Sequence, residues 1–173
     1  MKKLIEQLLF LARGDSGRNQ LVMEEMDLSQ MMREVYEESM MIHPDRQWRL
    51  DADTSIFVTG DADMLKQTAR ILVYNAVKYT GDGAKITLRT RLKDGQPCFE
   101  VQDNGIGIKQ EDLGRIFDRF FRSDPARSRS TGGTGLGLSI AKWIVERHGG
   151  YFDVFSREEI GTRIGVVLPQ KES

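Results

Sequence analysis

The stretch ITLRTRLKDGQPCFEV, residues 86–101, decides what kind of fold this chain adopts. From Ile86 to Leu92, residues suited to one buried face alternate with charged or polar residues, as in a half-buried β-strand. Asp94-Gly95 is a typical two-residue hairpin turn, and the apolar run Cys98 to Val101 follows it. The sequence therefore predicts an antiparallel hairpin in the middle of the chain.

Helices and a second hairpin are predicted on either side of it. Asp27 and Asp61 can each cap a helix, the first running to about Met41 and the second to Thr80. A further helix is expected over about residues 138–148 and a hairpin over 151–168, with short strands at 21–26, 48–52 and 56–58. Helices interleaved with antiparallel hairpins indicate an α+β fold: a two-layer sandwich whose mixed, mostly antiparallel sheet carries helices on one face.

Residues 1–13, MKKLIEQLLFLAR, predict a short N-terminal helix rather than a secretion signal. Glu6 and Gln7 interrupt the apolar run, and Ile5, Leu8 and Leu9 follow helical spacing. The polar stretch 14–20 reads as a linker. No apolar run approaches the ~20 residues of a membrane span, so we expect no membrane insertion of this chain.

The composition is that of a folded domain, with 39% hydrophobic and 29% charged residues among 173. Because 25 Lys and Arg stand against 26 Asp and Glu, no overall positive charge favours nucleic acid, and we expect no such partner. The single cysteine, Cys98, cannot form an internal disulfide, so we expect a reducing compartment, the cytoplasm.

The end of the second predicted helix carries side chains suited to a nucleotide. In NAVKYT, residues 75–80, Asn75, Lys78 and Tyr79 share one side of the last turns. An amide oxygen can ligate a hard cation, an ammonium can meet phosphate, and an aromatic ring can stack on a base. On these residues alone, an ordinary helix end with a lysine placed for the helix dipole fits equally well.

Two glycine-rich stretches follow. DNGIGI, residues 103–108, places a carboxylate at a strand end, where it can accept a hydrogen bond from an exocyclic amine; a hairpin or bulge would use the same pattern. GGTGLGL, residues 132–138, opens onto a helix, whose first N–H groups form an anion site. It is neither a Walker loop nor a dinucleotide fingerprint, and a flexible connector is the alternative.

Residues 116–122, IFDRFFR, and 123–131, SDPARSRST, join these two stretches. Their composition is that of a mobile lid, with Arg122, Arg127 and Arg129 just before the phosphate-type loop. The alternative is a short helix that buries its phenylalanines and leaves the arginines solvated.

In their order and spacing, these four segments resemble the catalytic ATP-binding domain of bacterial sensor histidine kinases. That family belongs to an ATPase superfamily shared with type II topoisomerases, a heat-shock chaperone and mismatch-repair proteins. Residues 75–80 match its N box, 103–108 and 133–138 its two glycine boxes, and 116–122 its phenylalanine box. The resemblance covers roughly residues 20–169. We therefore expect a catalytic domain at 20–173 and, at 1–19, the remnant of a dimerisation helix with its linker.

The resemblance implies roles for named residues. Asp103 would accept the adenine amino group, between Tyr79 and Ile108, and Asn75 would hold Mg²⁺. Lys78 and Arg122 would be catalytic, because they neutralise phosphate charge. The other nucleotide contacts would be Gly105, Gly107, Phe121, Arg127, Arg129, Gly133, Thr134, Gly135, Leu136, Gly137 and Leu138.

The implied function is transfer of the γ-phosphoryl group of ATP to a histidine on a dimerisation domain outside this chain, for relay to a response regulator. His43 and His148 lack the acceptor's sequence context, so we expect both to be structural and the chain, as a fragment, not to phosphorylate itself. Ile71 stands where the family carries a polar residue beside the metal. A catalytically degenerate nucleotide-binding module and a serine-directed anti-sigma kinase are the alternatives.

Overall fold

The computed structural model describes residues 2–17, 20–122 and 134–170. Its larger sheet has the strand order β2-β4-β5-β7-β6, and β2 is parallel to β4 while all other pairs are antiparallel. The strands are β2 (Gln47–Asp51), β4 (Lys85–Lys93), β5 (Gln96–Asp103), β6 (Tyr151–Arg157) and β7 (Gly161–Val167). Both predicted hairpins are present, and the expected mixed, mostly antiparallel sheet is confirmed.

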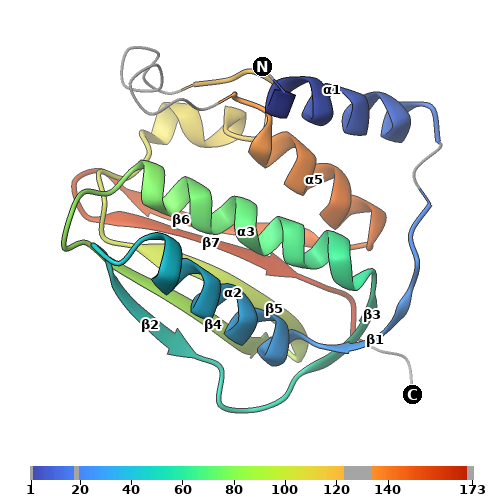
Figure 1. Ribbon diagram of the computed structural model, residues 1–173, viewed down its shortest axis with the longest axis horizontal. Coiled ribbons are helices and arrows are strands. Elements are labelled where there is room, and N and C mark those ends of the chain that lie inside the picture. The colour runs from blue at the N-terminus through green and yellow to red at the C-terminus, as the bar shows by residue number, and fades with distance from the viewer. Residues whose placement is uncertain (1, 18–19, 123–133, 171–173) are drawn as a thin grey trace.

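Three helices cover one face of this sheet, as Figure 1 shows: α2 (Leu28–Ile42), α3 (Ala62–Lys78) and α5 (Gly137–Arg147). Both predicted caps are confirmed. Asp27 Oδ1 accepts from the Ser29 N–H at 2.9 Å, and Asp61 Oδ1 accepts from the Met64 N–H at 3.1 Å. These bonds satisfy N–H groups that the first helical turn leaves unpaired.

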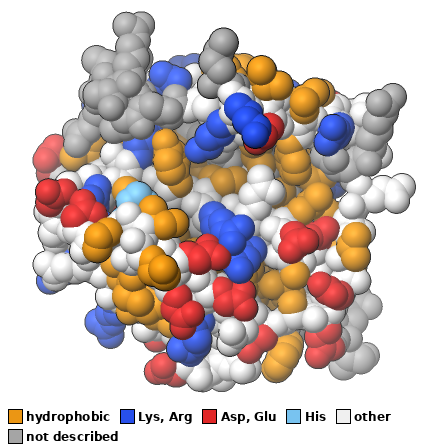
Figure 2. Space-filling view, viewed as in Figure 1, with side chains coloured by type: hydrophobic (Ala, Val, Ile, Leu, Met, Phe, Trp, Pro, Cys, Tyr) orange, Lys and Arg blue, Asp and Glu red, His pale blue; other side chains and the backbone are white. Residues whose placement is uncertain are grey.

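The core lies between the helices and the sheet. Ile86, Leu88 and Phe99 of the central hairpin are completely buried against it, as the alternation predicts. Leu92 continues the pattern in sequence but is exposed, because it lies near the turn. On the outer surface, ion pairs join α2 to α3, Lys66 to Glu34 at 2.9 Å and Arg70 to Glu38 at 2.7 Å. Figure 2 shows charges of both signs interspersed with apolar side chains on this face.

A small second sheet pairs β1 (Glu24–Asp27) with β3 (Phe57–Gly60) in antiparallel register. Both strands begin later than the sequence predicts. Their ends are set by pairing with each other, which local sequence does not reveal.

The N-terminal helix α1 (Lys2–Asp15) packs on α5. Its Phe10 ring meets the Trp143 ring edge-on, with centroids 5.2 Å apart. Gly14, expected in the linker, is instead helical and buried. It packs so closely on Trp143 that a Cβ at this position would lie 2.6 Å from the indole nitrogen. The predicted stripe of Ile5, Leu8 and Leu9 is exposed. Among the described residues, no helix has the length and apolar character needed to cross a membrane.

His148 joins two helices and is structural, as expected. Its Nδ1 lies 2.7 Å from the Ile144 carbonyl oxygen, and its Nε2 accepts from the Asp61 N–H at 3.0 Å. The end of α5 is thereby bonded to the beginning of α3.

Replacing His148 with alanine should lower the free energy of unfolding by about 1–3 kcal/mol, because the buried Asp61 N–H loses its acceptor. Urea denaturation measures this. His43→Ala, at a half-exposed position, is the control and should cost far less. Equal costs for the two variants would contradict this role for His148.

Candidate functional site

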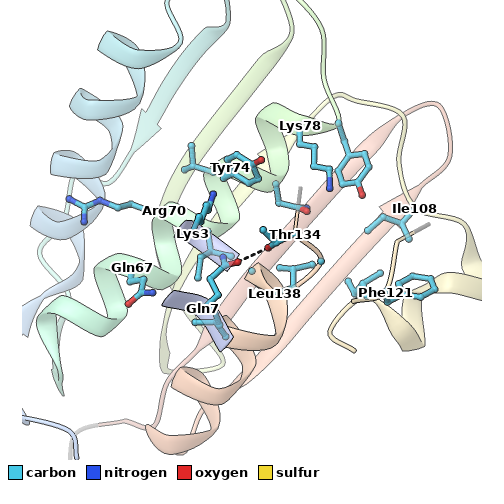
Figure 3. Close-up of a pocket in the computed structure, with 18 of the residues that line it drawn as sticks. Lys3, Gln7, Gln67, Arg70, Tyr74, Lys78, Ile108, Phe121, Thr134 and Leu138 are labelled. Carbon is cyan, nitrogen blue, oxygen red and sulfur yellow. Dashed lines mark hydrogen bonds between the residues drawn. The ribbon is translucent and has the colours of Figure 1, made fainter. Parts of the chain in front are cut away.

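A cavity of about 1210 Å³ lies beside the C-terminal half of α3, and Figure 3 shows part of its lining. Ten of the residues predicted to contact the nucleotide or its metal line it: Asn75, Lys78, Tyr79, Gly107, Ile108, Phe121, Thr134, Gly135, Gly137 and Leu138. They come from four stretches that are far apart in the chain. In Figure 3, Ile108 and Phe121 lie on one side and Thr134 and Leu138 toward the middle, with Lys78 above them.

Other sequence-predicted residues are placed differently. Asp103, Gly105, Arg122 and Leu136 are described by the structure but are not among the lining residues. Leu136 is completely buried in the core, so only its backbone is suited to a ligand. Arg127, Arg129, Gly133 and the rest of the expected lid lie outside the described residues. The short helix considered above as the alternative for residues 116–122 is not formed: these residues adopt turns and irregular structure, preceded by the 3-10 helix η1 (Gln110–Arg115).

The end of α3 brings a cation and an aromatic ring together. The Lys78 Nζ lies 5.4 Å from the centroid of the Tyr79 ring. Burial, and secondarily the charge of Arg122, hold the pKa of Lys78 below its ordinary value of 10.5. An anion placed here would relieve both effects, because it would compensate the positive charge.

The first glycine loop packs against this helix end. The Tyr79 carbonyl accepts a hydrogen bond from the Ile106 N–H at 3.4 Å. A Cβ on Gly105 would collide with that same carbonyl oxygen, and a Cβ on Gly107, whose φ is +74°, would collide with the Arg157 carbonyl. Both positions therefore require glycine.

Ser156 on β6 fixes the other end of this loop. Its buried hydroxyl accepts from the Ile108 N–H at 2.7 Å and donates to the Gly161 carbonyl at 3.1 Å. Ile108 is thereby held at the cavity wall. Sequence reasoning missed Ser156, and a lone serine in a strand carries no signal that would have identified it.

Asp103 is a buried carboxyl group adjoining the glycine loop, with 8% of its surface exposed. Burial raises its pKa from 3.8 to about 6, although hydrogen bonds from the Gly105 and Thr162 backbone N–H groups act in the opposite direction. The bond to Gly105 is 2.8 Å long. A carboxylate has acceptor capacity left after two such bonds.

The second glycine loop ends at the N-terminus of α5, where no side chain caps the helix. Gly135, with φ +78°, packs on the backbone of Phe120, whose N–H donates to the Gly135 carbonyl at 2.7 Å. N–H groups at a helix N-terminus favour an anion, and glycines leave room for close approach. Gly137 also lies near Ile71, whose Cγ2 is 3.4 Å from where a Cβ would stand. An apolar side chain therefore borders the proposed phosphate end.

Helix α1 contributes cavity residues that the sequence did not indicate. Gln7 Oε1 accepts from the Thr134 hydroxyl at 2.6 Å, the dashed bond in Figure 3, and the Lys3 Nζ lies 4.3 Å from the Tyr74 ring centroid. The Asp15 carboxylate pairs with Arg119 at 2.9 Å. An amphipathic pattern predicts that a helix has an apolar face but not which part of the protein that face packs against, so these contacts could not be predicted.

Comparison with known proteins identifies the family. The family model described as "Histidine kinase-, DNA gyrase B-, and HSP90-like ATPase" matches residues 60–172. The chain belongs to this ATPase family. It is 38% identical over 170 residues to the sensor histidine kinase YkoH of Bacillus subtilis, covering 95% of this chain and 36% of that protein. It is 37% identical over 167 residues to the histidine-protein kinase ArlS of Staphylococcus aureus, covering 96% and 37%.

Solved structures agree. A mycobacterial sensor histidine kinase, MprB, superimposes with a TM-score of 0.75 at 29% identity over 88% of this chain and all of that one. Full-length ShkA in complex with AMPPNP gives 0.80 at 25% identity over 96% of this chain and 35% of that one. The chain therefore corresponds to the ATP-binding catalytic domain of sensor histidine kinases, and the resemblance drawn from the motifs is confirmed. It spans just over a third of its curated relatives.

The raised pKa of Asp103 predicts a pH-dependent stability. The folded state holds this proton more tightly than the unfolded state, so the stabilisation from protonation is present below pH 4 and is lost as pH rises through about 6. Asp103→Asn should therefore gain roughly 2–3 kcal/mol of unfolding free energy, relative to the parent, between pH 4 and pH 7.

Urea denaturation of both proteins at a series of pH values measures this difference. Asp53→Asn, at an exposed position, is the matched control and should show little pH dependence relative to the parent. If the free energies of unfolding of Asp103→Asn and the parent differ by the same amount at every pH in this range, the raised pKa of Asp103 is ruled out.

Proposed function

We propose that this chain binds Mg-ATP in the cavity beside α3 and supplies the γ-phosphoryl group to a histidine on a separate dimerisation domain. The phosphoryl group would then pass to an aspartate on a response regulator. One observation carries the proposal: four separated stretches line the same cavity. Residues 75–79 supply an amide, a cation and an aromatic ring, residues 107–108 and Phe121 supply apolar surface, and residues 134–138 lead into a helix N-terminus. The solved ShkA complex with AMPPNP supports it by analogy.

The adenine base would lie between Tyr79 and Ile108, with its amino group donating to Asp103. Guanine presents an oxygen at that place, so a carboxylate would repel it. The loop geometry supports this arrangement, because Gly105 and Gly107 bring the backbone close to Tyr79 and to the turn after β6. Asp103 does not itself line the cavity, and its proposed contact with the base is supported by its place beside the loop, where it accepts a hydrogen bond from the Gly105 N–H.

The triphosphate would extend toward the N-terminus of α5. Backbone N–H groups of residues 135–138 would meet phosphate oxygens, and Lys78 and Arg122 would neutralise their charge. The Asn75 amide oxygen, at the same cavity, would hold Mg²⁺ together with those oxygens. The metal would supply charge neutralisation, so the catalysis is positioning and electrostatic stabilisation. Gly133, Thr134, Arg127 and Arg129 complete the proposed phosphate contacts.

Residues 1–19, which include helix α1, are proposed as the remnant of a dimerisation helix with its linker, and residues 20–173 as the catalytic domain. A cytoplasmic location follows from the need for ATP and for an aspartate-bearing partner. Neither part of this proposal requires nucleic acid or insertion of this chain into a membrane.

The second candidate function is nucleotide binding without phosphoryl transfer. Ile71 favours it, because an apolar side chain beside Gly137 can neither ligate Mg²⁺ nor orient a water molecule. The two functions share the same nucleotide site and differ only in the transfer step.

Mg-ADP should raise the melting temperature, since a ligand at one hundred times its dissociation constant stabilises by about 2.7 kcal/mol. Mg-GDP should do far less. Asp103→Asn should abolish the shift caused by Mg-ADP while the protein stays folded, and Asp53→Asn should preserve it. A normal shift in folded Asp103→Asn would refute the proposed adenine contact.

A dimerisation domain bearing the acceptor histidine, taken from a relative such as YkoH, should acquire acid-labile label from [γ-³²P]ATP when mixed with this chain. The chain alone should acquire none. Lys78→Ala should slow transfer by at least tenfold through lost charge neutralisation. If the chain binds nucleotide but transfers no label, and Ile71→Asn restores the transfer, the second function is supported instead.

A further inference from the structure

Arg46, in the turn between α2 and β2, binds the C-terminal end of α3 from outside the cavity. Its Nη2 donates to the Val77 and Thr80 carbonyls, each at 3.0 Å, and its Nε donates to the Thr80 hydroxyl at 3.2 Å. Only 10% of its side chain is exposed. Arg46 belongs to none of the four motifs and does not line the large cavity.

These bonds are made at the C-terminal end of α3, where carbonyl groups lack hydrogen-bond partners within the helix. The last carbonyls of α3 have no partners farther along the helix, and a guanidinium there also meets the negative end of the helix dipole. Thr80 completes the arrangement, because its hydroxyl donates to the Ala76 carbonyl at 2.9 Å while accepting from Arg46. Arg46 therefore fixes both the final turn of α3, through Val77, and Thr80, which follows the C-terminal cap residue.

The guanidinium is itself held in place. Its Nη1 pairs with the Asp45 carboxylate and lies 3.6 Å from that of Asp82. The backbone joins the same two loops, since the Gly83 N–H donates to the Asp45 carbonyl at 2.7 Å. The side chain that caps α3 is thus anchored at both of its neighbouring loops.

The turn that Arg46 fixes is the one that carries Lys78 and Tyr79. Tyr79 is the C-terminal cap of α3, and its carbonyl binds the Ile106 N–H of the glycine loop. A small displacement of this turn would move Lys78, Tyr79 and the loop together, although Arg46 touches none of their side chains in the bonds described above.

We propose that Arg46 is a positioning residue for nucleotide binding, acting through Thr80 and the last turn of α3 on Lys78 and Tyr79. This inference rests on the nucleotide site proposed above. It requires arginine rather than lysine, because a single ammonium cannot bind two carbonyls and a hydroxyl in the fixed geometry of a guanidinium.

Calorimetric titration with Mg-ADP tests the effect on binding. Arg46→Ala should weaken binding at least tenfold, and Arg46→Lys should restore only part of the loss. Lys66→Ala is the matched control, because Lys66 also joins α3 to the preceding segment, through Glu34 and Glu38, but at the other half of the helix. It should lower stability and change affinity less than twofold. Equal weakening by Lys66→Ala and Arg46→Ala would overturn the proposal.

A double-mutant cycle with Lys78→Ala separates positioning from general destabilisation. If Arg46 acts through this turn, Arg46→Ala should weaken binding much less in the Lys78→Ala background than in the parent. Full additivity of the two losses would contradict the proposed route.

Hydrogen exchange provides a readout that needs no nucleotide. The Tyr79 and Thr80 amides, bonded to the Asn75 and Val77 carbonyls, should exchange at least tenfold faster in Arg46→Ala, while amides of residues 65–72 keep their rates. Unchanged exchange at Tyr79 and Thr80 overturns the proposal, as does faster exchange with unaltered affinity.

If the parent binds no Mg-ADP, the proposed nucleotide site fails and the positioning role fails with it, whereas exchange still reports whether Arg46 caps α3. Thr80→Val, which removes the hydroxyl contact, replaces Arg46→Ala if that variant does not fold.

Discussion

The close contact between the end of α3 and the first glycine loop is the constraint on which the site depends. The Tyr79 carbonyl both accepts from the Ile106 N–H and occupies the space that a Cβ on Gly105 would need. Because backbone meets backbone here, neither segment can shift without the other. The contact fixes Tyr79 and Lys78 relative to Ile108, which Ser156 holds from the opposite side.

Burial destabilises the ionised forms of two side chains near this contact, Asp103 and Lys78. Burial raises the pKa of Asp103 and lowers that of Lys78, so both groups are less easily ionised than in water. Groups perturbed in this way concentrate at functional sites. A ligand that offers a hydrogen-bond donor to Asp103 and negative charge to Lys78 would stabilise both ionised forms, and an adenine nucleotide has both features.

The sequence predicted the sheet, its hairpins and the helices well, because alternation, capping aspartates and the Asp94-Gly95 turn are local signals. It also identified ten cavity residues, since their motifs are contiguous. It could not predict contacts between distant segments: the packing of Gly14 on Trp143, the bond from Ile108 to Ser156, or the burial of Asp103 away from the cavity lining. Each of these depends on which surfaces meet after folding, and no single stretch of sequence records that.

The most direct test of the shared nucleotide site is a titration of the ¹⁵N-labelled chain with Mg-ADP, followed by amide chemical shifts. The account predicts that Tyr79, residues 105–108 and residues 135–138 respond together at one dissociation constant, with little change on the outer strand β2. Shifts confined to one of these segments, or a different dissociation constant for each, would contradict a single site built from all of them.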